Sequence, residues 1–176
     1  MNRPSLETLN PEQIIEFLGD SDGSFRGVAS SALSDRGKTS LPALIEGMSH
    51  RDWQVRAACT GLLDHLADDR CIDPLRRALQ DPSPHVRRHA VHSLGCNGCK
   101  VAPLNADIVA LLLETALRDK SIRVRRVAVH QLGLQTFDPR AMEALQTILH
   151  QDTDSKILSR AEFALQSQQR QQANVV

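Results

Sequence analysis

Apolar positions along this chain repeat with the spacing of amphipathic helices. One order of small and large apolar residues occurs twice, as Val86, Ala90 and Leu94 and again as Val124, Ala128 and Leu132. Side chains four residues apart lie on one face of an α-helix. Turn-forming residues, Asp81-Pro82-Ser83-Pro84, come before the first of these runs and cannot continue a preceding helix. The pattern therefore predicts a helix, a polar turn and a second helix that begins near Val86.

This helix-turn-helix unit recurs along the chain with a nearly constant period. Its apolar anchors are Phe25, Val55, Val86, Val124 and Ile157, spaced by 30, 31, 38 and 33 residues. A helical unit repeated at such a period is the signature of a stacked solenoid, in which each repeat contacts only its neighbours. The sequence predicts an all-α fold, a right-handed α-solenoid of about five repeats.

The repeats divide the chain into three parts. Residues 1–10 are expected to be an N-terminal lead-in, and residues 11–165 a single repeat domain. Its units are expected at about 11–40, 41–71, 72–105, 106–140 and 141–165. Residues 166–176 are rich in glutamine with little to bury, which predicts a flexible tail.

Composition and charge narrow the classes of function. Aromatic residues make up 3% of the chain and tyrosine is absent, so the core is expected to be aliphatic. No run approaches the roughly 18 apolar residues of a membrane span, and no secretion signal opens the chain, which predicts a cytoplasmic protein without membrane contact. The net charge is zero, with basic residues in excess only within 72–140. A local excess of this kind argues against a dedicated nucleic-acid binder.

The phrase Asp…Val-Arg-x-x-Ala…Leu-Gly, spelled out from Asp81 to Gly95 and from Asp119 to Gly133, resembles HEAT repeats. It is similar to the short HEAT-like type of bacterial phycobilin-lyase-related proteins, over roughly residues 11–165. The resemblance implies a structural ladder of pairs between successive units, Arg56 with Asp81, Arg87 with Asp119 and Arg125 with Asp152. Two enzyme classes of this architecture fit poorly. The iron hydroxylases use His-Glu pairs, which are absent here, and the DNA glycosylases need more aromatic residues than this chain has.

A second set of basic residues suggests a binding surface. Arg88 and His92 are four residues apart, and the next repeat has Arg126 and His130 at the same positions. This spacing places each pair on one face of its helix. The two pairs are expected to form a basic row on the concave side, about 10 Å apart, suited to an acidic peptide. A solvated polar face without a ligand is the alternative.

The connection after Leu94 carries two cysteines. Cys96 and Cys99 form a Cys-x-x-Cys pair that follows His92 and His89, a donor set that zinc or iron accepts. Ordinary reduced thiols are the competing interpretation, a redox dithiol is a third, and nothing in the composition calls for disulfides. Cys59 stands where other repeats have alanine, which predicts a buried, inert thiol.

These features predict a non-catalytic scaffold that binds the acidic segment of a protein partner on its concave face and needs no cofactor. Two alternatives stay open. One is a metal-binding module built on the loop with Cys96 and Cys99. The other, implied by the resemblance, is an accessory subunit of tetrapyrrole (phycobilin) lyase type, which is the enzymatic possibility.

Overall fold

The computed structural model describes residues 5–174, which fold into α-helices joined by turns and short 3-10 segments. No β-strand occurs within that range, as the all-α prediction requires. The helices are α1 (Pro11–Ile15), α2 (Gly23–Asp35), α3 (Leu41–Gly47), α4 (Trp53–Leu66), α5 (Ile72–Ala78), α6 (Pro84–Gly95), α7 (Ile108–Arg118), α8 (Ile122–Leu134), α9 (Pro139–Gln151) and α10 (Ser155–Ala173).

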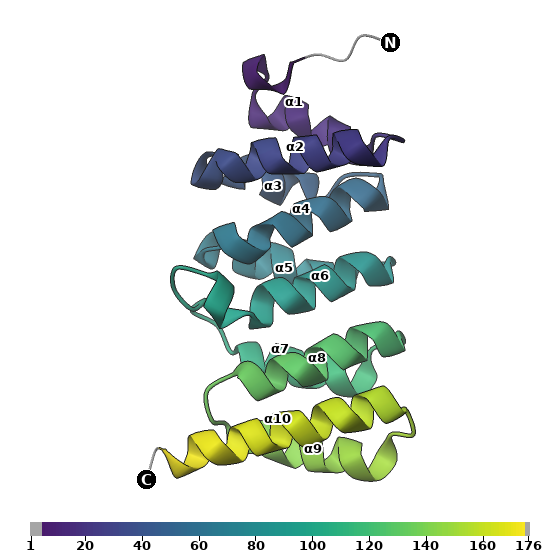
Figure 1. Ribbon diagram of the computed structural model, residues 1–176, viewed down its shortest axis with the longest axis vertical. Helices are drawn as coiled ribbons and strands as arrows, with labels where there is room; N and C mark the ends of the chain where they lie inside the picture. The colour runs from purple at the N-terminus through teal and green to yellow at the C-terminus, as the bar shows by residue number, and fades with distance from the viewer. Residues whose placement is uncertain (1–4, 175–176) are drawn as a thin grey trace.

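Successive helix pairs stack along one axis to form a solenoid (Figure 1). The even-numbered helices α2, α4, α6, α8 and α10 lie side by side from the N-terminal to the C-terminal end, and the odd-numbered helices lie behind them. We call the even-numbered row the B-helix layer and the odd-numbered row the A-helix layer. Consecutive B helices pack directly against one another from α4 to α10. The predicted solenoid of about five helical repeats is therefore confirmed.

The predicted anchors form the core between the two layers. Val86, Ala90 and Leu94 are fully buried in α6. Their equivalents in α8 are buried to the same extent, and Cys59 fills the small-residue position of α4 with no exposed surface. Burial raises the pKa of the Cys59 thiol to about 12, so it stays protonated and inert as expected. Aliphatic side chains dominate this core.

The glycine of each Leu-Gly pair allows two helices to approach closely. A Cβ added to Gly95 would lie 2.7 Å from the Cβ of Gln131 in α8, and one added to Gly133 would lie 2.6 Å from the Cα of Ala164 in α10. Helix α8 continues through Gly133 to Leu134. Helix α6 ends at Gly95, and at both positions the absence of a side chain lets neighbouring B helices come into contact.

The glutamine-rich segment is helical and packed, so the predicted flexible tail is wrong through Ala173. Helix α10 runs to Ala173, and Gln168 is fully buried against α8. The Gln168 amide nitrogen donates to the carbonyls of Leu132 (2.9 Å) and Gln135 (3.0 Å), and its oxygen accepts from the backbone N–H of Asp138 at 2.9 Å. Glutamine is retained in the core here because it satisfies backbone groups that would otherwise be unpaired. Residues 175–176 lie outside the described range.

The longest connection between repeats lies between α6 and α7, where Figure 1 shows a loop projecting to one side. It contains a 3-10 turn at Asn97–Cys99 and the buried Leu104. The backbone N–H of Asn105 donates to Asp69 of the preceding repeat at 2.9 Å. The loop accounts for the long spacing of 38 residues and is attached to the repeat before it.

The lead-in is partly packed as well. Leu6 is buried, and its carbonyl accepts a hydrogen bond from the Arg36 guanidinium at 2.8 Å. Residues 1–4 of the expected lead-in lie outside the described residues. Among the helices of residues 5–174, none has both the length and the apolar character that a membrane span requires.

Candidate functional site

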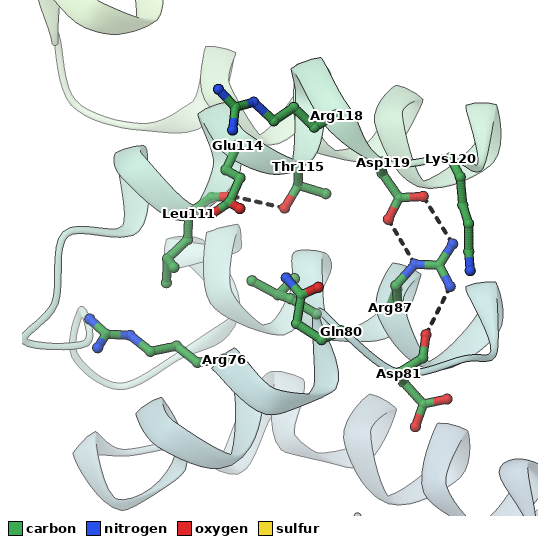
Figure 2. Close-up of a pocket in the computed structure, with 11 residues that line it drawn as sticks. Arg76, Gln80, Asp81, Arg87, Leu111, Glu114, Thr115, Arg118, Asp119 and Lys120 are labelled. Carbon is green, nitrogen blue, oxygen red and sulfur yellow. Dashed lines mark hydrogen bonds and ion pairs between the residues drawn. The ribbon is translucent and has the colours of Figure 1, made fainter.

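Three arginine–aspartate pairs connect successive turns of the solenoid. Arg56 donates from Nε and Nη2 to both carboxylate oxygens of Asp81, at 2.7 and 3.0 Å. Arg87 makes the same two bonds to Asp119, at 2.7 and 3.0 Å (Figure 2). The third pair is looser, since Arg125 reaches Asp152 through a single contact of 3.5 Å. The structure therefore contains the three pairs that the resemblance to HEAT-like repeats implied.

Each pair also closes the turns on either side of it. The Asp119 carboxylate accepts from the backbone N–H of Ser121 at 2.7 Å, while Arg87 Nη1 donates to the Asp81 carbonyl at 2.8 Å. The Arg87 and Asp119 side chains are only 5% and 6% exposed. The hydrogen bond to Asp119 raises the pKa of Arg87. Because both charged groups are occupied and buried, this pair is not available to a ligand.

A polar pocket of about 500 Å³ opens beside this pair, between α5 and α7 (Figure 2). Its lining includes the charged side chains of Arg76, Glu114, Arg118 and Lys120. Charges of both signs mix in this lining. The pocket is a gap between neighbouring repeats without convergent donors, so it does not define a ligand.

The predicted basic row is not a free cationic surface. Arg126 donates from Nε and Nη2 to the carboxylate of Asp154, the N-cap residue of α10, at 3.0 and 2.6 Å, and this bond holds the pKa of Asp154 at about 2. The His130 ring stacks on Phe163, with the ring centroids 6.3 Å apart. Within residues 5–174 only Arg88 of the four has no hydrogen-bond, ion-pair or stacking partner. The expected basic row is therefore wrong, and among the described residues Arg88 alone of the four is an unpaired cation.

His92, the fourth member of the row, faces the loop with the two cysteines. Its Nε2 lies 3.1 Å from Oδ2 of Asp64, which belongs to the last turn of α4 in the preceding repeat. One donor atom from each of Asp64, His92, Cys96 and Cys99 lies within 4.8 Å of the others. The proximity of His92 to the cysteine pair was foreseen from the sequence. His89 points elsewhere, because its ring packs against Gly61.

Cys96 and Cys99 are joined by a disulfide, whereas Cys59 and Cys71 are free and buried. The expectation that the chain has no disulfide is therefore wrong for this pair. Two residues of a Cys-x-x-Cys turn are close enough in space for the bond to form without rearrangement of the helices around it. Lys100 follows, nearly buried, and its Nζ donates to the Cys96 carbonyl at 2.6 Å. Burial lowers the pKa of this lysine.

Two residues of this cluster, Asp64 and Gln131, were not predicted from the sequence. Asp64 occupies the position at which the next two repeats have Gly95 and Gly133. A carboxylate in place of a repeat glycine could therefore have pointed to it. No sequence pattern pointed to Gln131, although its amide nitrogen lies 3.0 Å from His92 Nδ1. It is 39 residues from His92 and is brought to it only by the stacking of α6 on α8.

Comparison with known proteins agrees with this architecture. The profile of the family described as HEAT repeats matches residues 41–103. The bilin biosynthesis protein RpcF of Synechococcus sp. (strain WH8020) is 33% identical over 82 residues, which is 46% of this chain and 39% of that protein. The match thus spans less than half the length of this relative.

Solved structures show the same fold over most of the chain. The complex of CpcE and CpcF of phycocyanin lyase from Nostoc sp. PCC7120 contains a chain that superposes with a TM-score of 0.74 at 22% identity, covering 88% of this chain and 96% of that one. A computationally designed armadillo repeat protein for modular peptide recognition gives 0.52 at 15% identity, covering 93% and 87%. At these identities the likeness concerns the fold alone.

The fold and the comparisons define the protein as an α-solenoid of helical repeats. More closely, its repeats are similar to HEAT repeats, whose profile matches residues 41–103, and to the short HEAT-like repeats of bacterial phycobilin-lyase-related proteins.

Proposed function

We propose that this chain is a non-catalytic scaffold that binds a protein partner on the exposed side of the B-helix layer. The observation that carries the proposal is the pair of aromatic rings exposed on that layer. Trp53 of α4 and Phe163 of α10 are 43% and 53% exposed, although the chain has few aromatic residues. Exposed aromatic side chains are enriched at the centres of protein interfaces.

Each exposed ring is held in place by a histidine of a neighbouring repeat. Trp53 stacks on His85 of α6 with the ring centroids 5.0 Å apart, and Phe163 stacks on His130 of α8. A shallow depression of about 290 Å³ lies beside Trp53, bordered by Arg26 and His89. A ring that is already fixed loses little entropy when a partner covers it, so the surface is suited to binding.

Arg88 supplies the charge for an acidic segment of the partner. It lies one helical turn from His85, three residues along α6, and no carboxylate among residues 5–174 neutralises it. Arginine at such a place favours carboxylates through its planar, two-pronged donor geometry. An acidic segment laid across the B-helix layer would therefore contact Trp53 and Arg88 together.

The test is affinity capture from source cells at low and high salt, followed by titration calorimetry with the identified partner. We expect Arg88→Glu to weaken binding by at least about tenfold, because one charge is reversed within contact of the partner. Arg76→Glu reverses the same charge in α5 of the A-helix layer and is the matched control. Two outcomes would contradict the proposal. One is an equal loss of affinity in Arg88→Glu and Arg76→Glu. The other is a partner whose affinity is unchanged by both Arg88→Glu and Trp53→Ala.

The comparisons favour a second candidate, an accessory subunit of tetrapyrrole-lyase type. RpcF is a bilin biosynthesis protein, and the Nostoc sp. PCC7120 complex is a phycocyanin lyase of two named subunits. On this proposal the partner is a second helical-repeat chain and the ligand a linear tetrapyrrole. Titration with a linear tetrapyrrole such as phycocyanobilin, with and without the partner, tests it by absorption. A shift of the bilin spectrum supports this candidate, and an unchanged spectrum removes it.

A further inference from the structure

Two buried oxygen atoms at the Asp64–His92 cluster have no hydrogen-bond partner. They are Oδ1 of Asp64 and Oε1 of Gln131, and Arg36 holds the one other buried side-chain atom in this state among the residues that the structure describes. Asp64 is 9% exposed and Gln131 is 1% exposed. A buried carboxylate oxygen without a donor costs free energy, so two orphaned oxygens flanking one histidine call for a ligand.

The groups around these atoms have the composition of a zinc site. Asp64 brings a carboxylate, His92 a ring nitrogen, and the cysteine loop two sulfurs, with one donor atom of each residue inside a common span of 4.8 Å. Zinc prefers four ligands drawn from sulfur, nitrogen and oxygen in a tetrahedral arrangement. Two cysteines with one histidine favour zinc over calcium or magnesium, which take oxygen ligands. We propose that Asp64, His92, Cys96 and Cys99, in the dithiol form of the loop, bind one Zn²⁺.

The surroundings of the four residues suit this ion. Gln131 contacts Nδ1 of His92, so rotation of its amide would let the unpaired Oε1 accept the Nδ1–H that a metal-bound histidine presents. The Lys100 ammonium lies beside the cysteine loop, bonded to the Cys96 carbonyl. Its charge offsets the single negative charge left when Zn²⁺ meets two thiolates and one carboxylate. Gly98 is exposed at the tip of the loop, and this side gives the ion a path from solvent.

The equivalent histidine of the next repeat shows that this arrangement is not a general property of the repeat. His130 lies at the position of His92, but it stacks on Phe163. In the repeat that precedes His130, the position equivalent to Asp64 is occupied by Gly95, which has no carboxylate. His130→Gln is consequently the matched control for His92→Gln, because it removes a histidine from the same helical position without touching the cluster.

The zinc form and the disulfide form exclude each other, since both use the same two sulfurs. Hydrogen peroxide would take one electron from each thiolate, join the sulfurs, and be reduced to two water molecules with uptake of two protons, while Zn²⁺ leaves. We expect one zinc ion released for each two thiols lost. Zinc that stays bound after the Cys96–Cys99 bond has formed would show that the sulfurs are not ligands and would overturn the proposal.

The main experiment uses the full chain, purified without chelators in a reducing buffer, loaded with Zn²⁺ and freed of unbound metal by gel filtration. Elemental analysis should find one zinc per chain in the wild type and in His130→Gln. It should find almost none in His92→Gln and Cys99→Ser. Gln131→Met, which removes only the support of His92, should weaken binding about 10- to 100-fold.

Cobalt substitution in the wild type keeps the test valid where a variant fails to fold. Co²⁺ at the site should give the thiolate charge-transfer absorption and the intense visible bands of a tetrahedral sulfur-containing site. Circular dichroism checks that each variant keeps its helices. A reduced wild-type chain that retains no zinc, or a cobalt spectrum without thiolate absorption, would refute the site. This test involves no protein partner, so its outcome is independent of binding on the B-helix layer.

Discussion

Arg87 and Asp119 are 32 residues apart in the sequence and form a two-bond ion pair between α6 and the turn that precedes α8. The same guanidinium donates to the Asp81 carbonyl in the turn between α5 and α6 of its own repeat. One side chain thus fixes the register of two consecutive repeats. Removal of either partner leaves the other charge buried, and this makes the pair a sensitive point of the fold.

Arg87→Met should destabilise the chain by about 3–5 kcal/mol, the usual cost of breaking a buried ion pair from one side. Arg125→Met is the control, because Arg125 reaches Asp152 through one contact of 3.5 Å between side chains that are 23% and 19% exposed. Its other hydrogen bond, to the Asp119 carbonyl, is also long at 3.2 Å. This variant should cost less than about 1 kcal/mol. Chemical unfolding followed by circular dichroism measures both. Similar losses for the two variants would show that the buried two-bond pair is no stronger than the looser, partly exposed one.

Gly133→Ala tests the close approach of α8 to α10. The new methyl group would meet the Cα of Ala164 at 2.6 Å, and since this atom belongs to a helix backbone the two helices must separate. We expect a loss of about 1–3 kcal/mol in the free energy of unfolding. Gly27→Ala is the matched control in α2, where a Cβ meets nothing within 4 Å. That variant should stabilise by about 0.5–1 kcal/mol, so a thermal melt separates the two in sign.

Gln168→Ala tests whether the C-terminal helix is part of the core. It leaves the carbonyls of Leu132 and Gln135 and the N–H of Asp138 without their partner. The expected cost is about 1–3 kcal/mol, with lower protection of α10 against hydrogen exchange. Gln169→Ala next to it changes an exposed side chain and should stay within about 0.5 kcal/mol. Rapid hydrogen exchange of residues 166–173 in the wild type would contradict this packing and support the flexible tail predicted from the sequence.

His89 should make the stability depend on pH. Its pKa is lowered first by burial, then by the charge of Arg88 and by His92 and His85, while Asp64 opposes the shift. The unfolded chain therefore takes up a proton on this residue at a higher pH than the folded chain. The stabilisation is complete above the ordinary histidine value of about 6.5 and is lost as the pH falls through the lower folded pKa.

His89→Gln should accordingly flatten the fall in stability between about pH 7 and pH 5. Urea titrations across this range measure the slope. The exposed His150 provides the control, since His150→Gln should leave the slope as it is in the wild type. If both variants keep the wild-type slope, groups other than His89 carry the pH dependence.

Local sequence patterns were sufficient to predict the repeats, but they did not predict which charged side chains are left unpaired on the surface. The basic row was expected because Arg88 and Arg126 stand at the same position of two repeats. Their environments differ all the same, since Asp154 in the cap of α10 pairs with Arg126 while Arg88 has no such neighbour. A periodic sequence predicts equal placement, whereas pairing depends on what the next repeat presents. The cysteine cluster shows the same limit, because Asp64 and Gln131 come from the repeats on either side.

The sequence by itself determined the helical repeat, its period, the aliphatic core and, through its resemblance to HEAT-like repeats, the arginine–aspartate pairs. These features follow from the spacing of residues within a repeat, and the same spacing recurs in each repeat. Only the tertiary structure decided the burial of Gln168, the role of Gly95 and Gly133 in helix contact, and the meeting of Asp64 with His92 and the cysteine loop. Each of these depends on the distance between side chains of neighbouring repeats some 30 to 40 residues apart, which the stacking of helices sets and no local pattern encodes.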